Sequence, residues 1–336
     1  MAKAVRMADI AKRLGVSTVT VSKALADQKG VSEEMRSRIK ALAEELGYRA
    51  PSSIRNEIRQ RSYNMGVLVA ETYIEKYATF YWELYQKINT SAGREHCFVI
   101  LEVLENSMEN ELEEPKLLKE DKIDGLMILG RIRTEYLQMI KKRHSIPLVY
   151  MDFYDKEAKA DCVISNSFYG AYHITNYLFE MGHRRIGFVG TLLATESITD
   201  RFLGYQKALM EHGQKVREDW VIPDRDQHIY LYDQIPLPKE MPTAFVCNSD
   251  LTASRMIRNL QDAGFRVPED ISIVGYDDWL HPGLCDIGIT TYSVDMNTMA
   301  RIGMRLMMDR VSGRDESGGM QVVEGDLVIR DSVRRI

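Results

Sequence analysis

Apolar residues recur at helical spacing in three short blocks near the start of the chain. The blocks are Ile10, Ala11 and Leu14, then Val19, Val21, Ala24 and Leu25, and last Met35, Ile39, Leu42 and Leu46. Polar residues fill the positions between them, so each block forms one apolar stripe on a helix. This pattern predicts three short amphipathic helices between residues 7 and 46.

Glycine and serine residues mark the expected helix boundaries. Gly15 separates the first two blocks, where one helix must end and the chain must turn sharply. Ser17 and Ser32 precede the second and third blocks, and a serine there can accept hydrogen bonds from the open amides of a helix. Two short helices joined by a glycine-containing turn and braced by a third form a helix-turn-helix. We therefore expect the second helix to be a recognition helix in the DNA major groove.

From Met65 onward, short apolar runs rich in β-formers alternate with amphipathic stretches of helical length. The runs of a first series are 66–70, 98–101, 125–129 and 147–151, and those of a second series begin at Cys162, Ile186, Ala244 and Ile271. Continuous apolar strands with helices between them predict parallel sheets covered on both faces. Two series predict two α/β lobes with a cleft at the carboxyl ends of the strands. Residues 290–295 and a helix over 296–311 are expected to cross back between the lobes.

The composition is that of an ordinary globular protein, with 45% hydrophobic and 28% charged residues in a chain of 336. The four cysteines, Cys97, Cys162, Cys247 and Cys285, lie far apart, which favours buried, reduced thiols over a metal site or a disulfide framework. We recognise no signal peptide and no apolar run of the roughly 20 residues that a membrane span requires. These features predict a cytoplasmic protein.

The distribution of charge supports contact with nucleic acid. Residues 1–61 hold 13 Lys and Arg against 7 Asp and Glu, whereas the remainder holds 31 against 42. A basic head on an acidic body suits attraction to phosphates. The expected outer face of the second helix also carries short hydrogen-bonding side chains and one cation, namely Thr18, Thr20, Ser22 and Lys23. The alternative is a small helical bundle with no role in nucleic-acid binding.

Residues 5–61 resemble the headpiece of the lactose- and purine-repressor family of bacterial transcription factors. The matching segments are Asp-Ile-Ala-Lys-Arg-Leu-Gly-Val-Ser-Thr-Val-Thr-Val-Ser-Lys-Ala-Leu, Val-Ser-Glu-Glu-Met-Arg and Leu-Gly-Tyr-Arg. The resemblance implies contacts with base edges by Thr18, Val19 and Lys23, with Val19 meeting a thymine methyl group. It implies phosphate contacts by Ser17, Thr20, Ser22 and Ser32, which set register but not sequence.

The junction that begins at Pro51 is a candidate hinge helix, with Ile54 and Ile58 on one face. In the family, this segment pairs with that of the dimer mate and inserts an apolar wedge in the minor groove. The resemblance places the wedge on Ile58, and the positive charge of Arg55 suits a contact with phosphate. Arg55 stands where the family has Ala, and one extra residue precedes the proline. A plain basic linker is the alternative.

The remainder, 62–336, resembles the periplasmic sugar-binding fold that the family uses as its sensor. Polar side chains at the ends of predicted strands, an arginine, three aromatic residues and a methionine suit a site for a small polyol. The candidates are Glu71, Phe80, Tyr81, Asp152, Arg201, Ser249, Asp277, Trp279 and Met296. The family resemblance favours Arg201, in its Arg-x-x-Gly-Tyr motif, and Asp277, in Gly-Tyr-Asp-Asp. The family's usual segment after the first strand survives here only as Phe80 and Tyr81.

The expected architecture is an N-terminal all-α helix-turn-helix headpiece with hinge segment, 1–61, and an α/β periplasmic-binding-protein-like core of two parallel-sheet lobes, 62–336. The core is expected to bind the effector and to dimerise. We interpret the chain as a sequence-specific DNA-binding transcriptional regulator of the repressor type, controlled by a sugar-like effector and acting on a palindromic operator. No catalytic motif, metal site or cofactor is expected. The alternative is a sugar-binding protein or an enzyme whose head is a protein-interaction module.

Overall fold

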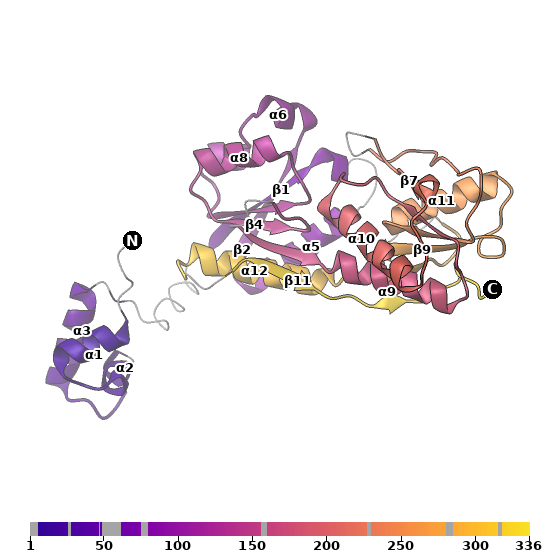
Figure 1. Ribbon diagram of the computed structural model, residues 1–336. Coiled ribbons are helices and arrows are strands. Elements are labelled where there is room, and N and C mark those ends of the chain that lie inside the picture. Colours follow the sequence, from indigo (N-terminus) through magenta and orange to yellow (C-terminus); the bar gives the residue numbers. More distant parts are fainter. Residues whose placement is uncertain are drawn as a thin grey trace. The chain divides into compact units, whose positions relative to one another are not determined.

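A computed structural model describes residues 6–25, 28–46, 48, 62–74, 80–155, 160–226, 230–279, 285–314 and 318–336. The chain divides into two compact units, Met1–Ser62 and Tyr63–Ile336, which are called here the head and the core. Figure 1 shows the helical head in indigo and the mixed α/β core in colours that run from purple through magenta and orange to yellow.

Within its described residues, the head has three helices, α1 (Met7–Leu14), α2 (Thr18–Leu25) and α3 (Glu33–Glu45). Their apolar faces meet in one small cluster, whose fully buried members are Ile10, Ala11, Val21, Ala24, Ile39 and Ala43. Gly15 ends α1 with φ of 65°, in the left-handed region that glycine occupies without strain. The three helices and the turn at Gly15 agree with the apolar pattern.

The first lobe of the core is built on a six-stranded sheet in the order β11-β5-β4-β3-β1-β2. All of its strand pairs are parallel. The strands are β1 (Tyr63–Ala70), β2 (Cys97–Leu104), β3 (Gly125–Leu129), β4 (Leu148–Met151), β5 (Asp161–Ser165) and β11 (Met320–Val323).

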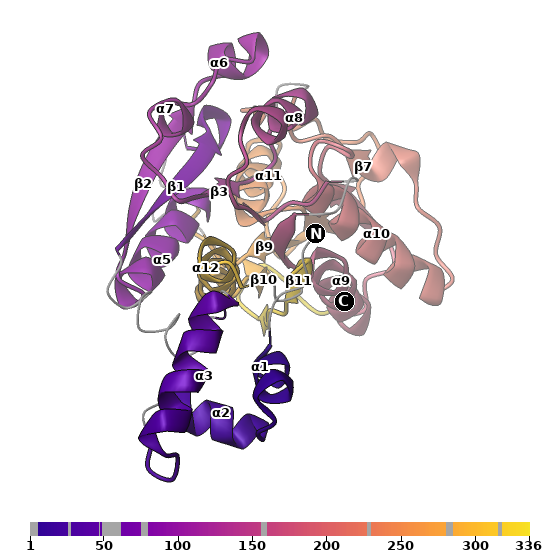
Figure 2. The same cartoon turned by 90° about the vertical axis from the view of Figure 1, so that its left-hand side faces the viewer.

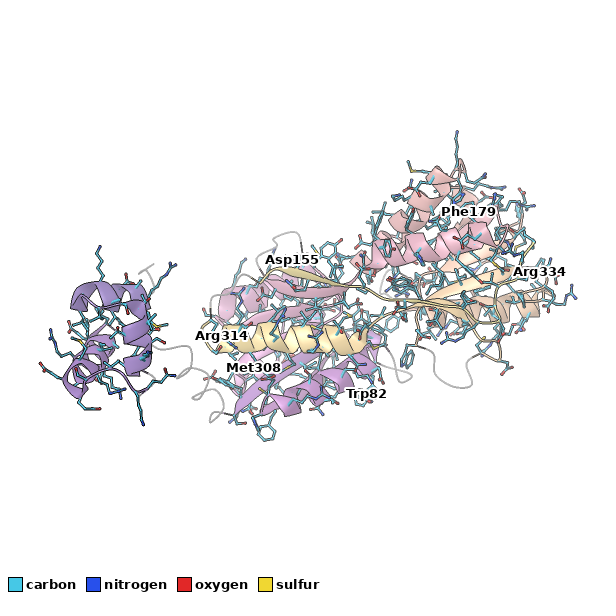
Figure 3. The ribbon with its side chains drawn as sticks, turned by 90° about the horizontal axis from the view of Figure 1, so that it is seen from below. Trp82, Asp155, Phe179, Met308, Arg314 and Arg334 are labelled. Carbon is cyan, nitrogen blue, oxygen red and sulfur yellow. The ribbon has the colours of Figure 1, made fainter. Side chains whose placement is uncertain are left out.

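Helices cover both faces of this sheet. They are η1 (Glu71–Tyr73), α5 (Phe80–Arg94), α6 (Asn106–Glu111), α7 (Lys116–Lys119), α8 (Thr134–Arg143) and α12 (Met296–Val311). Figure 2 shows α5 and α12 on one side of the sheet and α7 and α8 on the other. Helix α12 packs lengthwise against α5 (Figure 3), so the last long helix of the chain belongs to the first lobe.

The second lobe has a six-stranded sheet in the order β12-β10-β9-β8-β6-β7. Its strands are β6 (Ile186–Val189), β7 (Val221–Ile222), β8 (Ala244–Cys247), β9 (Ser272–Asp277), β10 (Thr290–Ser293) and β12 (Leu327–Val328), and β12 alone among them is antiparallel to its neighbour. Its helices are α9 (Ser167–Glu180), α10 (Glu196–Glu211), η2 (Glu218–Trp220) and α11 (Asp250–Asp262). Helices α9 and α10 lie side by side, and α11 covers the other face (Figure 1).

The chain passes between the lobes three times, after β5, after β10 and after β11. The predicted crossing at residues 290–311 is therefore confirmed. The grouping of strands was wrong in one place, because the run at Cys162 was counted with the second series and β5 pairs with β4 in the first sheet. An apolar run indicates a buried strand but carries no information about which sheet receives it. The chain first enters the second lobe between β5 and α9, because α9 packs on the second lobe.

Three of the cysteines are buried as expected, but Cys285 is half-buried. Among the described residues, no helix is both long enough and apolar enough to span a lipid bilayer.

Candidate functional site

The outward face of α2 carries most of the residues predicted to contact DNA. Thr18, Ser22 and Lys23 are exposed, because Val21 and Ala24 take the buried positions of the same helix. Val19 is 61% exposed although it falls in the second apolar block, so it does not belong to the core of the head. An exposed methyl-bearing side chain at the start of α2 is available for an apolar contact outside the protein.

Two of the predicted phosphate-binding serines are helix caps. The Ser17 hydroxyl accepts from the backbone N–H of Thr20 at 3.1 Å and lies 2.9 Å from the Thr20 hydroxyl. The Ser32 hydroxyl accepts from the N–H of Met35 at 3.4 Å. Both serines are exposed at helix N-termini, where the helix dipole and the open amides favour an anion. Arg55 and Ile58 lie outside the described residues.

A cavity of about 210 Å³ lies in the core at the carboxyl ends of the strands, with residues from both lobes in its wall. The first lobe contributes five residues to the wall, Thr72, Tyr73, Phe80, Tyr81 and Asp152. Those of the second lobe include Thr195, Ser197, Arg201, Arg225, Tyr230, Asn248, Ser249, Arg255, Asp277 and Trp279. Polar groups and aromatic faces thus share the wall of one cavity, as in sites for small organic ligands.

Seven of the nine predicted effector residues line this cavity, and two do not. The seven are Phe80, Tyr81, Asp152, Arg201, Ser249, Asp277 and Trp279. Glu71 is absent from the wall because the chain enters a 3-10 turn after β1, in which successive side chains point in different directions and Thr72 and Tyr73 face the cavity. Met296 is buried at the start of α12, which packs against the first lobe.

Arg201 of α10 is held by protein groups on every side of its guanidinium. Its Nε donates to the Ser167 hydroxyl at 3.3 Å, and one terminal nitrogen donates to the Asp277 carboxylate at 3.2 Å. The other terminal nitrogen donates to the backbone carbonyl of Asn248, and the guanidinium stacks 3.8 Å from the centroid of the Tyr276 ring. With the residue only 5% exposed, these contacts fix the direction in which Arg201 meets the cavity.

Two carboxylates, Asp152 of the first lobe and Asp277 of the second, line the cavity with Arg201. Burial raises the pKa of Asp152 to about 6, against the lowering effects of Arg201 and of the hydrogen bond that the Tyr81 hydroxyl donates at 2.9 Å. Burial raises the pKa of Asp277 to about 7, again opposed by Arg201. Both aspartates have left-handed backbone, with φ of 68° for Asp152 and 106° for Asp277. Such strained positions gather at functional sites, where the surrounding structure holds them.

Arg225 is a cavity residue that the sequence analysis missed. It pairs in bidentate fashion with the fully buried Asp224, at 3.0 and 2.8 Å. Although burial opposes ionisation, Arg225 and hydrogen bonds from Asn248 and Thr252 hold the pKa of Asp224 well below its usual value. The remaining terminal nitrogen of Arg225 has no hydrogen-bond acceptor within the part of the chain that the structure describes. The pair follows β7, whose apolar run is too short to attract notice in the sequence.

Ser249 and Trp279 are positioned by α11. Ser249 caps this helix by accepting from the N–H of Thr252 at 3.1 Å, and its neighbour Asp250 is buried and accepts from the backbone N–H of Trp279 at 3.0 Å. Asn248, which follows β8 directly, also lines the cavity. It is a polar residue at a strand end, so the criterion that selected Ser249 would have selected it as well.

Hydrogen bonds join the two lobes beside the cavity. The Asn106 amide of α6 donates to the Tyr230 hydroxyl at 2.6 Å, and Arg131 lies 3.3 Å from Glu196 of α10. The Tyr154 hydroxyl donates to Asp200 at about 3.1 Å. The lobes are therefore closed over the cavity, and any ligand that alters this closure changes the relation between them.

A helix-turn-helix head joined to a two-lobed core with an enclosed cavity defines the class of ligand-responsive DNA-binding regulators. Comparison with known proteins supports this class. The profile of the family described as "Bacterial regulatory proteins, lacI family" matches residues 6–51, and that of a "Periplasmic binding protein-like domain" matches residues 175–333. The HTH-type transcriptional repressor PurR of Pectobacterium carotovorum subsp. carotovorum (strain PC1) is 30% identical over 331 residues, 97% of this chain and 96% of the relative.

Solved structures share the fold at low sequence identity. The transcriptional regulator CelR in complex with cellobiose aligns with a TM-score of 0.69 and 23% identity over 98% of this chain and 99% of CelR. The lac repressor dimer bound to operator and the anti-inducer ONPF aligns with a TM-score of 0.66 and 21% identity over 99% and 100%. The chain belongs to the lacI family of bacterial regulatory proteins. It is a DNA-binding transcriptional repressor with an effector-binding core, and its relatives are repressors, not enzymes.

Proposed function

We propose that the chain binds a palindromic operator as a homodimer and that a small sugar-like effector, bound in the cavity between the lobes, sets its affinity for DNA. Residues 1–61 would contact DNA, and residues 62–336 would bind the effector and the second subunit. The observation that carries this proposal is a single cavity whose polar groups come from both lobes. A ligand that contacts both lobes favours one closure angle, and its affinity is then linked to that of the DNA.

The chemistry of the cavity supports a sugar. Phe80, Tyr81 and Trp279 offer aromatic faces for the C–H surface of a pyranose ring. Arg201 and Arg225 offer fixed donors, while Asp152 and Asp277 can accept from hydroxyl groups. Each guanidinium already has a carboxylate partner, so the cavity presents directional hydrogen bonds with little net charge. CelR, which shares this fold, was solved as a complex with cellobiose.

On the head, we assign base contacts to Thr18, Val19 and Lys23. The exposed Val19 methyl groups suit a thymine methyl, and Lys23 can donate to guanine as a point cation. Phosphate contacts are assigned to four hydroxyl residues, Ser17, Thr20, Ser22 and Ser32. Ile58 keeps the wedge role that the family resemblance implies, and Arg55 is assigned a phosphate contact because of its charge.

The dimer interface is assigned to the edge of the first sheet at β2. Among the described strands it pairs with β1 only, and its exposed apolar side chains are Phe98, at 66% exposure, Ile100 and Val103. An exposed apolar edge strand is a liability unless another chain covers it. A two-fold axis here pairs two heads for two operator half-sites.

We assign no catalytic step, metal or cofactor to the cavity. The Ser249 hydroxyl donates to Thr252, Asp152 accepts from Tyr81 and Asp277 accepts from Arg201. Because these contacts hold each side chain in a fixed direction, we assign the groups to ligand binding. We assign the protein to the cytoplasm, where its operator lies.

A sugar titration with two readouts tests the proposal. Neutral monosaccharides and disaccharides, cellobiose included, are added to the full chain while tryptophan fluorescence and operator binding are followed. We expect one of them to change both signals, with Trp279→Phe removing most of the fluorescence change and Trp82→Phe, outside the cavity, retaining it. A panel in which no sugar changes either signal contradicts a sugar effector, and a sugar that changes fluorescence alone contradicts the linkage to DNA.

A further inference from the structure

The end of the recognition helix α2 needs partners from outside the helix. The last carbonyl groups of any α-helix have no intrahelical donors. In α2, the carbonyl of Lys23 accepts from the backbone N–H of Gln28 at 2.9 Å. The carbonyl of Ala24 accepts from a side chain of another helix, which makes this turn depend on a tertiary contact.

That side chain is Arg36 of α3. One terminal nitrogen donates to the Ala24 carbonyl at 3.3 Å, and the other donates to the Gln28 carbonyl at 2.8 Å. The Nε atom lies 3.5 Å from the Glu33 carboxylate, and the Arg36 side chain is only 11% exposed. The guanidinium thus joins the last turn of α2, the segment beyond it and the first turn of α3.

The chemistry of this contact requires arginine. A planar guanidinium presents its two terminal nitrogens in a rigid fork and can reach both carbonyls at once, whereas a lysine ammonium acts as a point donor. A cation at the C-terminus of α2 also opposes the negative end of the helix dipole. Val21 and Ala24 fix the helix in the apolar core, and Arg36 adds polar contacts at its last turn.

The turn that Arg36 holds is the one that carries Lys23, the cation assigned to a base edge. We propose that Arg36 is a positioning residue for operator recognition: it fixes the last turn of α2 so that Lys23 and the outward face meet the bases in register. This role rests on the assignment of α2 to the major groove. Arg36 itself does not touch DNA, because its donors are occupied by carbonyls and its side chain is covered.

The proposal separates sequence-specific from non-specific binding. Phosphate contacts supply most non-specific affinity, and base contacts supply discrimination. A misdirected last turn therefore lowers the ratio of operator affinity to random-duplex affinity and leaves the salt dependence of binding unchanged. If Arg36 instead contacted a phosphate, its removal would weaken both complexes equally and lower the salt slope by about 0.9.

The test uses the full chain and duplexes that the wild-type protein enriches from a random pool, with an unselected duplex as the non-specific probe. Binding of both is measured by fluorescence anisotropy over a salt series for wild type, Arg36→Met, Arg36→Lys and Arg38→Met. Arg38 is an exposed arginine on the same helix and serves as the matched control. Circular dichroism reports whether each head is folded.

We expect Arg36→Met to lower the specificity ratio by about tenfold or more, the scale of one lost base contact, with Arg36→Lys losing less and Arg38→Met within about twofold of wild type. If Arg36→Met does not fold, the test depends on Arg36→Lys, for which we expect the specificity ratio to fall by at least about threefold. A folded variant with the wild-type ratio, or equal loss on both duplexes with a smaller salt slope, overturns the proposal. A wild-type protein that enriches no duplex overturns the assignment of α2 as well.

Discussion

Replacing Asp277 with asparagine provides a test of the electrostatics of the cavity. Asparagine keeps the shape of the side chain but cannot ionise. Burial raises the pKa of Asp277 from 3.8 to about 7, even though Arg201 lies 3.2 Å away and favours the charged form. The folded protein therefore retains a proton on Asp277 over a pH range in which the unfolded chain has lost it.

The sign of the effect follows from proton linkage. Between pH 4 and 7, the folded state binds more protons at Asp277 than the unfolded state, so the contribution of this group to stability falls as pH rises. With the pKa at 3.8 in the unfolded chain and about 7 in the folded one, linkage gives a loss of about 2–3 kcal/mol from pH 5 to pH 8. Asp277→Asn lacks this loss.

The assay is chemical denaturation of the full chain at pH 5, 6, 7 and 8, followed by tryptophan fluorescence of the core. The free energy of unfolding of wild type minus that of Asp277→Asn should fall by about 2–3 kcal/mol across this range. The exposed Asp262 serves as control, since Asp262→Asn should track wild type at every pH. A difference that stays flat or grows with pH would refute the assigned burial of Asp277.

Three further substitutions test the head, the cavity and the packing of the core. Lys23→Ala should relax base preference at one operator position by about 1–3 kcal/mol in a competition against operator variants, and unchanged preference everywhere would remove its assigned role. Arg201→Ala should abolish the response of operator binding to the effector while binding itself persists; a normal response would exclude Arg201 from the site. Gly204→Ala should lower the free energy of unfolding by about 1–3 kcal/mol, because a Cβ there would lie 2.1 Å from the Phe168 carbonyl where α9 and α10 meet; a melting temperature equal to wild type would contradict that close contact.

Local patterns in the sequence were sufficient to predict most of the helices and strands and seven of the residues that line the cavity. Gly15 and the serine caps act through neighbours a few residues away, and a strand end places Asp152 or Asp277 at the same edge of a sheet as its neighbours. These signals depend on short stretches of chain, so they can be recognised from one sequence without an alignment.

Features that depend on long-range packing were not predictable. The pairing of β5 with the first sheet and the burial of Met296 depend on segments far away in the sequence. The Asp224–Arg225 pair follows a strand too short to be recognised, and the carbonyl partners of Arg36 lie eight and twelve residues away from it. Such contacts become visible only when the chain is folded.

The central claim is that the outward face of α2 reads the operator. Sequencing the duplexes that the full chain enriches from a random pool tests it most directly, with wild type and Thr18→Ala/Lys23→Ala compared in parallel. We expect wild type to enrich one two-fold symmetric sequence. We expect the double variant to lose base preference at symmetry-related positions of that sequence. Enrichment of the same sequence with the same strength by both proteins would contradict the account.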